Sequence, residues 1–281
     1  MNFIKKLAAS ARLLLPGHDP DFIVIGAQKC ATSSLHYYLD QHDNMIGSEP
    51  KEIHYFDRDR HHGKSLAQYR SHFRGPSGKL YFESTPSYLY SPGAIEAIAA
   101  RYPNMKAIVL FREPVARAYS AWNHYRQHFE SGRYRATLPN RPRREGNLLY
   151  EKFFEDRTVF PSFRECLDIE LDLIEQDIGF EPSLLRRGLY LQQLENYWKY
   201  FSEKQLMIIG FKDFIGDTAA TLERITAFVG ADPHDWSTLD REPKNAIAYQ
   251  LPMREKDRRF VAQYYAEPNR RLFERIGQLN W

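Results

Sequence analysis

The stretch from Phe22 to Leu35 constrains the fold more than any other part of the chain. It reads FIVIGAQKCATSSL, so an apolar run stops at Gly26, a polar turn follows, and an amphipathic segment begins at Leu35. That order predicts a buried strand, a tight turn and the start of a helix. Backbone amides and hydroxyls at a helix N-terminus, with a lysine beside them, favour a phosphate or sulfate group. The sequence therefore predicts an anion-binding loop suited to a nucleotide-like ligand.

The spacing of this loop differs from that of ATP- and GTP-binding loops. Those loops read G-x-x-x-x-G-K-[ST] and place lysine next to the hydroxyl that holds Mg²⁺. Here Lys29 comes three residues after Gly26 and three residues before Thr32. The best later strand, Ala107–Phe111, is followed by Arg112 and not by an aspartate that would steady Mg²⁺. We therefore expect an anion site that works without a metal.

Several segments of the chain, taken in order, resemble motifs of the PAPS-dependent sulfotransferases. The donor of these enzymes is 3′-phosphoadenosine 5′-phosphosulfate (PAPS). Gly26–Thr32 is similar to the family's 5′-phosphosulfate loop, and Lys51–Asp57 to the segment that holds its catalytic acid. Phe111–Ser120 is similar to the 3′-phosphate site, and residues 188–198 and 267–281 to the C-terminal half. The likeness is strongest to heparan-sulfate-type and related bacterial carbohydrate sulfotransferases. It implies transfer of a sulfonate from PAPS to a hydroxyl or amine of an acceptor, which would be a glycan or a small molecule.

Strands and helices alternate along the chain, which favours a parallel sheet. We expect strands at Phe22–Ile25, Leu80–Glu83, Ala107–Phe111 and Leu206–Gly210, and helices at 32–42, 92–101, 114–129, 162–177, 188–201, 217–229 and 254–276. The predicted fold class is α/β, a single domain with a central parallel sheet flanked by helices and a P-loop-like phosphosulfate-binding loop. Residues 1–20 are expected to form an N-terminal extension, and residues 21–281 the sulfotransferase domain.

The amino-acid composition limits the classes of partner and the cellular compartment that we expect. The net charge of +3 gives no argument for nucleic acid as a partner. The two cysteines, Cys30 and Cys166, are too few for a secreted disulfide framework, which predicts a reduced, cytoplasmic compartment. Residues 1–15 are too short an apolar stretch to cross a bilayer; they are read as a packed helix, a loose end or a weak membrane-surface helix. The sequence does not indicate an oligomeric state.

The resemblance assigns a donor site. It implies PAPS contacts from Lys29, Cys30, Ala31, Thr32, Ser33, Ser34, Arg112, Ser120 and Tyr190. Lys29 would meet the charge that develops on the leaving 5′-phosphate. Arg112 follows a buried strand, where open α/β sheets bind ligands, and its planar fork suits a phosphate. Two interpretations of Arg117 stay open: it makes a third contact with the phosphate, or it is a surface charge.

Glu52 is the predicted general base. In an extended segment Glu52 and His54 share one face, and a buried carboxylate there would have the raised pKa that a base needs. The resemblance places the base at Glu52 with His54 as its neighbour, whereas residue types alone leave His54 a near equal, because histidine is the commonest acid–base residue. With His54 as the base, the acceptor would be a phenol, a lipid or a polyketide alcohol.

The chain departs from the family pattern in two places. Cys30 and Ala31 stand where related loops usually carry glycine, and a Cβ there restricts backbone approach to a phosphate. Ser84 stands where heparan-type enzymes carry a lysine, so the share of that lysine would fall to Lys29, Ser84 or a water. The arginine-rich residues 132–157 are read as a solvated loop or as a flap, and residues 244–254 as a loose match to the loop over the donor. A magnesium-dependent nucleotide kinase and a binding-only protein stay open as alternatives.

Overall fold

The computed structural model describes residues 17–57, 65–91, 93–132, 148–155, 157–178, 181–240 and 252–281. Contacts group the chain into two compact units. The first, here called the sheet unit, comprises the chain up to Arg112, Gln192–Asn245 and the last three residues. The second, the helical unit, comprises Glu113–Leu191 and Ala246–Gln278. The predicted extension 1–20 lies almost wholly outside the described residues.

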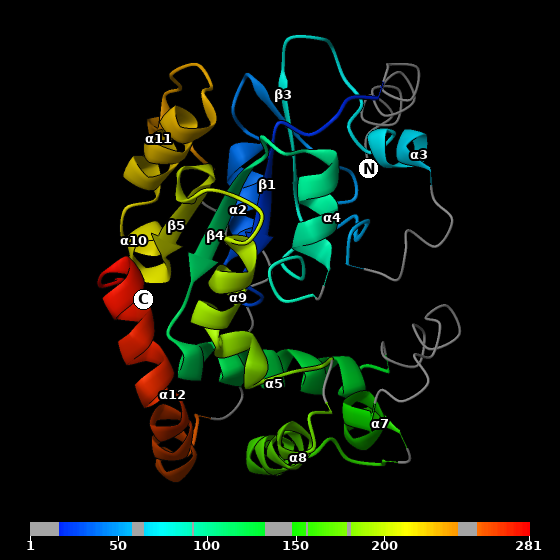
Figure 1. The fold of residues 1–281 in the computed structure, drawn as a ribbon, viewed down its shortest axis with the longest axis vertical. Coiled ribbons are helices and arrows are strands. Elements are labelled where there is room, and N and C mark those ends of the chain that lie inside the picture. Colours follow the sequence, from blue (N-terminus) through cyan, green and yellow to red (C-terminus); the bar gives the residue numbers. More distant parts are fainter. Residues whose placement is uncertain are drawn as a thin grey trace. The chain divides into compact units, whose positions relative to one another are not determined.

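The sheet unit is built on five parallel strands. They are β1 (Phe22–Gly26), β2 (Met45–Gly47), β3 (Leu80–Ser84), β4 (Lys106–Phe111) and β5 (Leu206–Gly210), in the order β2-β3-β1-β4-β5. Figure 1 shows β3, β1, β4 and β5 side by side. All of β1 is buried, as expected for a central strand of a parallel sheet with helices on its faces. The predicted α/β class and the four predicted strands are therefore confirmed.

Helices accompany the strands. The sheet unit contains α2 (Thr32–Leu39), α3 (Leu66–Arg70), α4 (Ala94–Arg101), α10 (Phe211–Gly216), α11 (Thr218–Val229) and 3₁₀ turns at Glu203–Gln205 and Trp236–Thr238. The sequence did not predict β2, α3 or α10, which are too short to show a period of their own. The predicted helix at 188–201 was wrong at both ends, because a 3₁₀ turn, Arg186–Gly188, precedes α9 (Tyr190–Tyr197).

The helical unit is formed mainly by α5 (Pro114–Glu130), α7 (Leu148–Phe154), α8 (Phe163–Glu175) and α12 (Glu255–Ile276). The first turn of α5 contains Pro114, and the Glu113 carboxylate accepts hydrogen bonds from the amides of Val115 and Ala116 at 3.1 and 2.7 Å. An acidic cap of this kind favours a helix start. Residues 133–147 of the arginine-rich stretch lie outside the described residues, while its end forms α7.

Buried polar groups organise the helical unit. The Glu170 carboxylate accepts hydrogen bonds from the Ser183 hydroxyl at 2.6 Å and from the amides of Leu184 and Leu185 at 2.7 and 2.9 Å. Arg117 is fully buried and donates to the Leu184 carbonyl. The surface-charge interpretation of Arg117 was therefore wrong: its guanidinium is part of the core of this unit. Burial of such a charge requires hydrogen-bonding partners, which the carbonyl supplies in part.

Candidate functional site

The predicted anion loop connects β1 to α2. Its backbone turns at Lys29 and Ala31, which have φ values of 67° and 63° in the left-handed region. Helix α2 begins at Thr32, and Ala31 supplies no side-chain cap to it. Amides in the first turn of a helix have no intrahelical partner, so they are open to an anion. A Cβ on Gly26 would lie 3.1 Å from the Leu89 side chain, so a larger residue at this strand end would require Leu89 to shift.

The side chains of the loop differ in exposure. Cys30 is fully buried, and its amide donates to the Ala27 carbonyl at 3.3 Å. Thr32 and Ser34 are buried, whereas Ala31 and Ser33 are partly exposed. The chain thus accommodates the departure from glycine: Cys30 packs inward, and Ala31 adopts a backbone conformation that glycine adopts without strain. Both cysteines are free thiols.

Lys29 is a destabilised cation. Burial and then the positive charge of Arg112 lower the pKa of Lys29 to about 8, and the charge of Glu52 opposes this only in part. Among the described residues, no carboxylate forms an ion pair with Lys29. Arg112, at the end of β4, stacks its guanidinium over the Phe211 ring at 4.8 Å. Two cations whose charges act on each other favour binding of an anion between or beside them.

Lys51 is a site residue that the sequence analysis missed. Its ammonium donates to Glu52 Oε1 at 2.7 Å and lies 3.4 Å from the Thr32 hydroxyl, so it connects the segment of the predicted base with the anion loop. The signal was present in the Lys51-Glu52 dipeptide, which the sequence analysis considered only for its carboxylate. A second ammonium therefore reaches the loop although the lysine of related enzymes is replaced by Ser84.

The hydroxyl of Ser84 already has a hydrogen-bonding partner. Ser84 is fully buried, and its hydroxyl shares a hydrogen bond with His36 Nδ1 at 2.9 Å. Burial, together with the charge of Lys51, lowers the pKa of His36 to about 3, so this imidazole is neutral. Of the three expected substitutes for the missing lysine, which were Lys29, Ser84 and a water, the hydrogen bond with His36 disfavours Ser84. Lys51, which was not among them, is a further ammonium near the loop.

The side chains of Glu52 and His54 lie close together, but the backbone between them differs from the extended segment that was predicted. His54 has a φ of 55°, so the segment is not extended. Even so, His54 Nε2 lies 3.4 Å from Glu52 Oε2, and His54 Nδ1 lies 2.7 Å from Asp57 Oδ2. Asp57 was not singled out from the sequence, because the turn that brings it to His54 could not be foreseen.

The expected raised pKa of Glu52 was wrong. The side chain is 41% exposed. Burial acts to raise the pKa, but the hydrogen bond with His54 and the charge of Lys51 outweigh it and lower the pKa of Glu52 to about 2. Glu52 is therefore ionised at neutral pH and held between two positively charged or proton-donating neighbours.

The two remaining predicted donor residues lie in the helical unit. Ser120, on α5, is 4% exposed, and Tyr190, the first residue of α9, is 1% exposed. Ser120 is thus no surface serine. Among the described residues, no group of three or more histidine, cysteine, aspartate or glutamate side chains could hold a metal ion. Nor does any helix in that part of the chain have the length and apolarity to cross a membrane.

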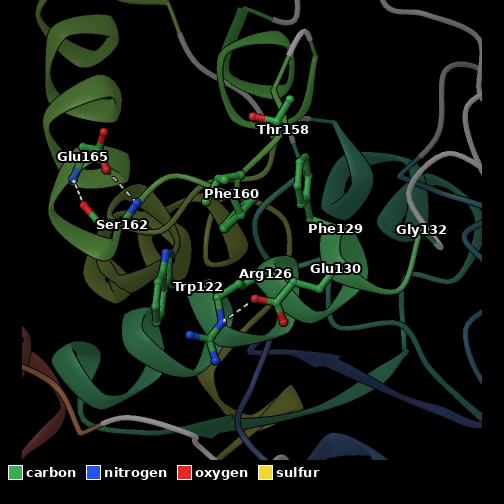
Figure 2. A pocket seen from close by; sticks show the side chains of 10 residues that line it. Trp122, Arg126, Phe129, Glu130, Gly132, Thr158, Phe160, Ser162 and Glu165 are labelled. Atoms are coloured by element: carbon green, nitrogen blue, oxygen red, sulfur yellow. Dashed lines mark hydrogen bonds and ion pairs between the residues drawn. The ribbon is translucent and has the colours of Figure 1, made fainter.

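The helical unit also contains a cavity of about 750 Å³ that the sequence did not indicate. Figure 2 shows aromatic rings of Trp122, Phe129 and Phe160 in its wall. Arg126 stacks on Trp122 with 4.9 Å between the guanidinium carbon and the ring centroid, and it pairs with Glu130 at 3.6 Å. None of the predicted site residues lines it.

Most of the chain, with parts of both units, is similar to known proteins. A model of the sulfotransferase domain matches residues 19–248. Over 93% of the chain, the sequence is 26% identical to the mouse (Mus musculus) bifunctional heparan sulfate N-deacetylase/N-sulfotransferase 4, of which it covers 30%. It is 31% identical over 75% of the chain to the human (Homo sapiens) heparan sulfate glucosamine 3-O-sulfotransferase 6, of which it covers 52%. The chain therefore spans only about a third and about half of the length of these two relatives.

A solved structure shows the same architecture. A sulfotransferase from Alicyclobacillus acidocaldarius superposes with a TM-score of 0.68 and 26% sequence identity. The match covers 93% of this chain and 97% of that one.

Proposed function

This chain belongs to the sulfotransferase family, and from that premise we propose that it transfers a sulfonate from PAPS to a hydroxyl or amine of a carbohydrate acceptor. The observation that carries the proposal is the state of Lys29. Its ammonium is half-buried beside Arg112, has a pKa lowered to about 8, and has no carboxylate partner among the described residues. A dianionic group at the loop would relieve this unfavourable charge.

The residues present fit the donor. Lys29, the first-turn amides of α2 and the Thr32 hydroxyl would hold the 5′-phosphosulfate, with Lys51 next to Thr32. Arg112 would hold the 3′-phosphate, for which its planar fork is suited. When bound, PAPS supplies the sulfonate and a 5′-phosphate leaving group. Four further side chains stay predicted contacts of the donor: Ser33, Ser34, Ser120 and Tyr190. The backbone of Cys30 and Ala31 also stays a predicted contact.

Glu52 is the proposed general base. Its carboxylate is ionised at neutral pH, is 41% exposed, and is close enough to the loop for its charge to act on Lys29. A base must hold its proton-accepting form at the working pH, and a pKa of about 2 ensures this. The same low pKa weakens its drive to take a proton. We therefore propose that the acceptor displaces Lys51 from Glu52, which raises the basicity of the carboxylate and frees Lys51 for the loop.

His54 is a second candidate for the base, because Asp57 contacts its Nδ1 at 2.7 Å. A carboxylate behind one imidazole nitrogen fixes the tautomer that leaves the other nitrogen as an acceptor. Here, however, the other nitrogen faces Glu52 and not an open position. We therefore propose that His54 orients Glu52.

The acceptor class rests on the relatives, two of which are named as heparan sulfate sulfotransferases. The test is transfer of ³⁵S from labelled PAPS, in the presence of a chelator, to three acceptors: an unsulfated glucosamine-containing polysaccharide, a simple phenol and a long-chain alcohol. Transfer to the polysaccharide supports the proposal. Transfer only to the phenol or alcohol would refute the carbohydrate assignment. Absence of transfer to any acceptor, together with Mg²⁺-dependent binding of ATP, would favour the nucleotide kinase.

A further inference from the structure

A buried carboxylate lies at the centre of a group of hydroxyls beside the proposed catalytic segment, Glu52–Asp57. Glu83, on β3, is 0% exposed. It accepts hydrogen bonds from the Tyr69 hydroxyl at 2.6 Å and from the Thr85 hydroxyl at 2.8 Å, and the Tyr88 hydroxyl lies 3.1 Å from both of its oxygens. We call these four residues the Glu83 cluster. All of them lie in the sheet unit.

One member of the cluster also holds the catalytic segment. The backbone amide of Tyr55 donates to the Tyr88 hydroxyl oxygen at 3.0 Å. A tyrosine hydroxyl has one hydrogen and two lone pairs. Because Glu83 takes the hydrogen, the oxygen of Tyr88 is oriented to accept from Tyr55. The contact falls on the residue after His54, whose φ of 55° is rare for a non-glycine residue and needs support from its surroundings.

Ahead of Glu52, the chain is held by a second set of anchors, which lie on β3. The Ser48 amide donates to the Phe82 carbonyl at 2.8 Å, and the Ser84 amide donates to the Lys51 carbonyl at 3.3 Å. The side chains of Glu52 and His54 thus lie between two fixed points, the β3 backbone before them and the Tyr88 hydroxyl after them. Loss of either point would let the turn at His54 relax.

Filling this part of the core with a carboxylate and three hydroxyls costs free energy of folding. Burial raises the pKa of Glu83 to about 7, although its three hydroxyl donors act in the opposite direction. An apolar side chain of similar size would fill the space without this desolvation penalty. Unlike an apolar side chain, the Glu83 carboxylate orients the Tyr88 hydroxyl.

We propose that Glu83 and Tyr88 are positioning residues, and that the chain of hydrogen bonds from Glu83 through Tyr88 to the Tyr55 amide fixes the turn at His54 so that Glu52 and His54 stay in contact. The inference rests on the proposed roles of those two residues. Neither Glu83 nor Tyr88 touches the reacting groups in this account. Both act through the backbone of the catalytic segment.

A matched pair of variants tests the proposal. Tyr88→Phe and Tyr69→Phe each remove one hydroxyl from Glu83, and both rings are buried, at 0% and 1% exposed. Both rings also pack on the catalytic segment: Tyr69 lies 4.5 Å from the Tyr55 ring, and Tyr88 lies 5.6 Å from the Phe56 ring, between centroids. Phenylalanine keeps these contacts. Only Tyr88→Phe also removes the hydrogen bond to the Tyr55 amide.

We expect both variants to lower the melting temperature, Tyr88→Phe by more than Tyr69→Phe because it also removes the acceptor of the Tyr55 amide. Tyr88→Phe should lower kcat about tenfold, as loss of one hydrogen bond that orients the site would, with the KM for PAPS and the Kd for PAP unchanged within about twofold. Tyr69→Phe should keep kcat within about twofold of wild type. Equal losses of kcat in the two variants, or wild-type kcat in folded Tyr88→Phe, would overturn the proposal.

Hydrogen exchange makes the test independent of activity. In Tyr88→Phe the Tyr55 amide should exchange faster and the His54 ring resonances should shift, whereas in Tyr69→Phe both should stay as in wild type. If Tyr88→Phe leaves the exchange of Tyr55 and the His54 resonances unchanged, the positioning role is wrong. If instead these signals respond as expected and Glu52→Gln retains full turnover, the positioning stands and the proposed role of Glu52 fails.

Discussion

Replacing Lys29 with methionine should stabilise the ligand-free protein at neutral pH and weaken its affinity for anions. Burial and the Arg112 charge lower the pKa of Lys29 from the ordinary 10.5 to about 8. The difference of about 2.5 between the two values corresponds to about 3.4 kcal/mol, at 1.36 kcal/mol per pH unit. This is the upper limit of what the charged Lys29 takes from the free energy of unfolding below pH 8. Methionine has a similar length and, like lysine, no branch at Cβ, so the strain of the positive φ is unchanged.

The sign of the pH dependence follows from proton binding. Between pH 8 and 10.5 the unfolded chain keeps the Lys29 proton that the folded protein releases, so the free energy of unfolding of wild type rises with pH in this window. Methionine binds no proton. The stability advantage of the variant should therefore be full below pH 8 and disappear as the pH approaches 10.5.

Urea denaturation at pH 7 and at pH 10, with and without PAP, measures both effects. The exposed Lys199→Met is the control for loss of a lysine charge as such. At pH 7, Lys29→Met should unfold at higher urea concentration than wild type, and Lys199→Met should not. PAP should raise the midpoint of wild type by mass action, and it should raise the midpoint of Lys29→Met by less. A variant less stable than wild type at pH 7, or an advantage that does not change with pH, would refute the reasoning.

Three further predictions concern the loop and the base. Arg112→Ala should weaken PAP more than adenosine 5′-phosphosulfate by about 1.5–3 kcal/mol in calorimetry, because only PAP carries the 3′-phosphate; equal weakening would place Arg112 elsewhere. Glu52→Gln should lower turnover by about 10²–10⁴-fold at unchanged PAP affinity, and because the pKa of Glu52 in the free enzyme is about 2, wild-type kcat/KM should show no acidic limb near neutral pH; such a limb would contradict Glu52 as the base. Ala31→Gly should raise the free energy of unfolding by about 1 kcal/mol, since it relieves the φ of 63°; a lower urea midpoint would show that the Cβ of Ala31 supports the loop.

The parts of the fold that could be predicted have a local signal. The run Phe22–Ile25 followed by glycine and a polar turn predicts β1, the loop and α2 within three residues at each end. By contrast, β2 consists of three residues, Met45–Gly47, and is held as a strand only by its pairing with β3. No window of sequence contains that information, because the pairing joins residues far apart in the chain.

The site was predicted in its residue types better than in its electrostatics. Lys29 and Glu52 were chosen from the sequence, but the pKa of Glu52 depends on whether Lys51 turns toward it or away, which spacing does not reveal. Asp57 could not be assigned because the positive φ of His54 brings it to the imidazole. The division into two units was not foreseen either, since the motifs follow one another without a change in composition.

Calorimetric titration of the metal-free protein with PAP and with adenosine 5′-monophosphate tests the central claim most directly, because it needs no acceptor. With a chelator present at pH 8, PAP should bind more tightly than the monophosphate, and its binding should be accompanied by proton uptake as Lys29, whose pKa is about 8, regains its proton beside the anion. Lys29→Met should abolish that uptake. Equal affinity for the two nucleotides, binding only with Mg²⁺, or PAP binding without proton uptake in wild type would contradict the account.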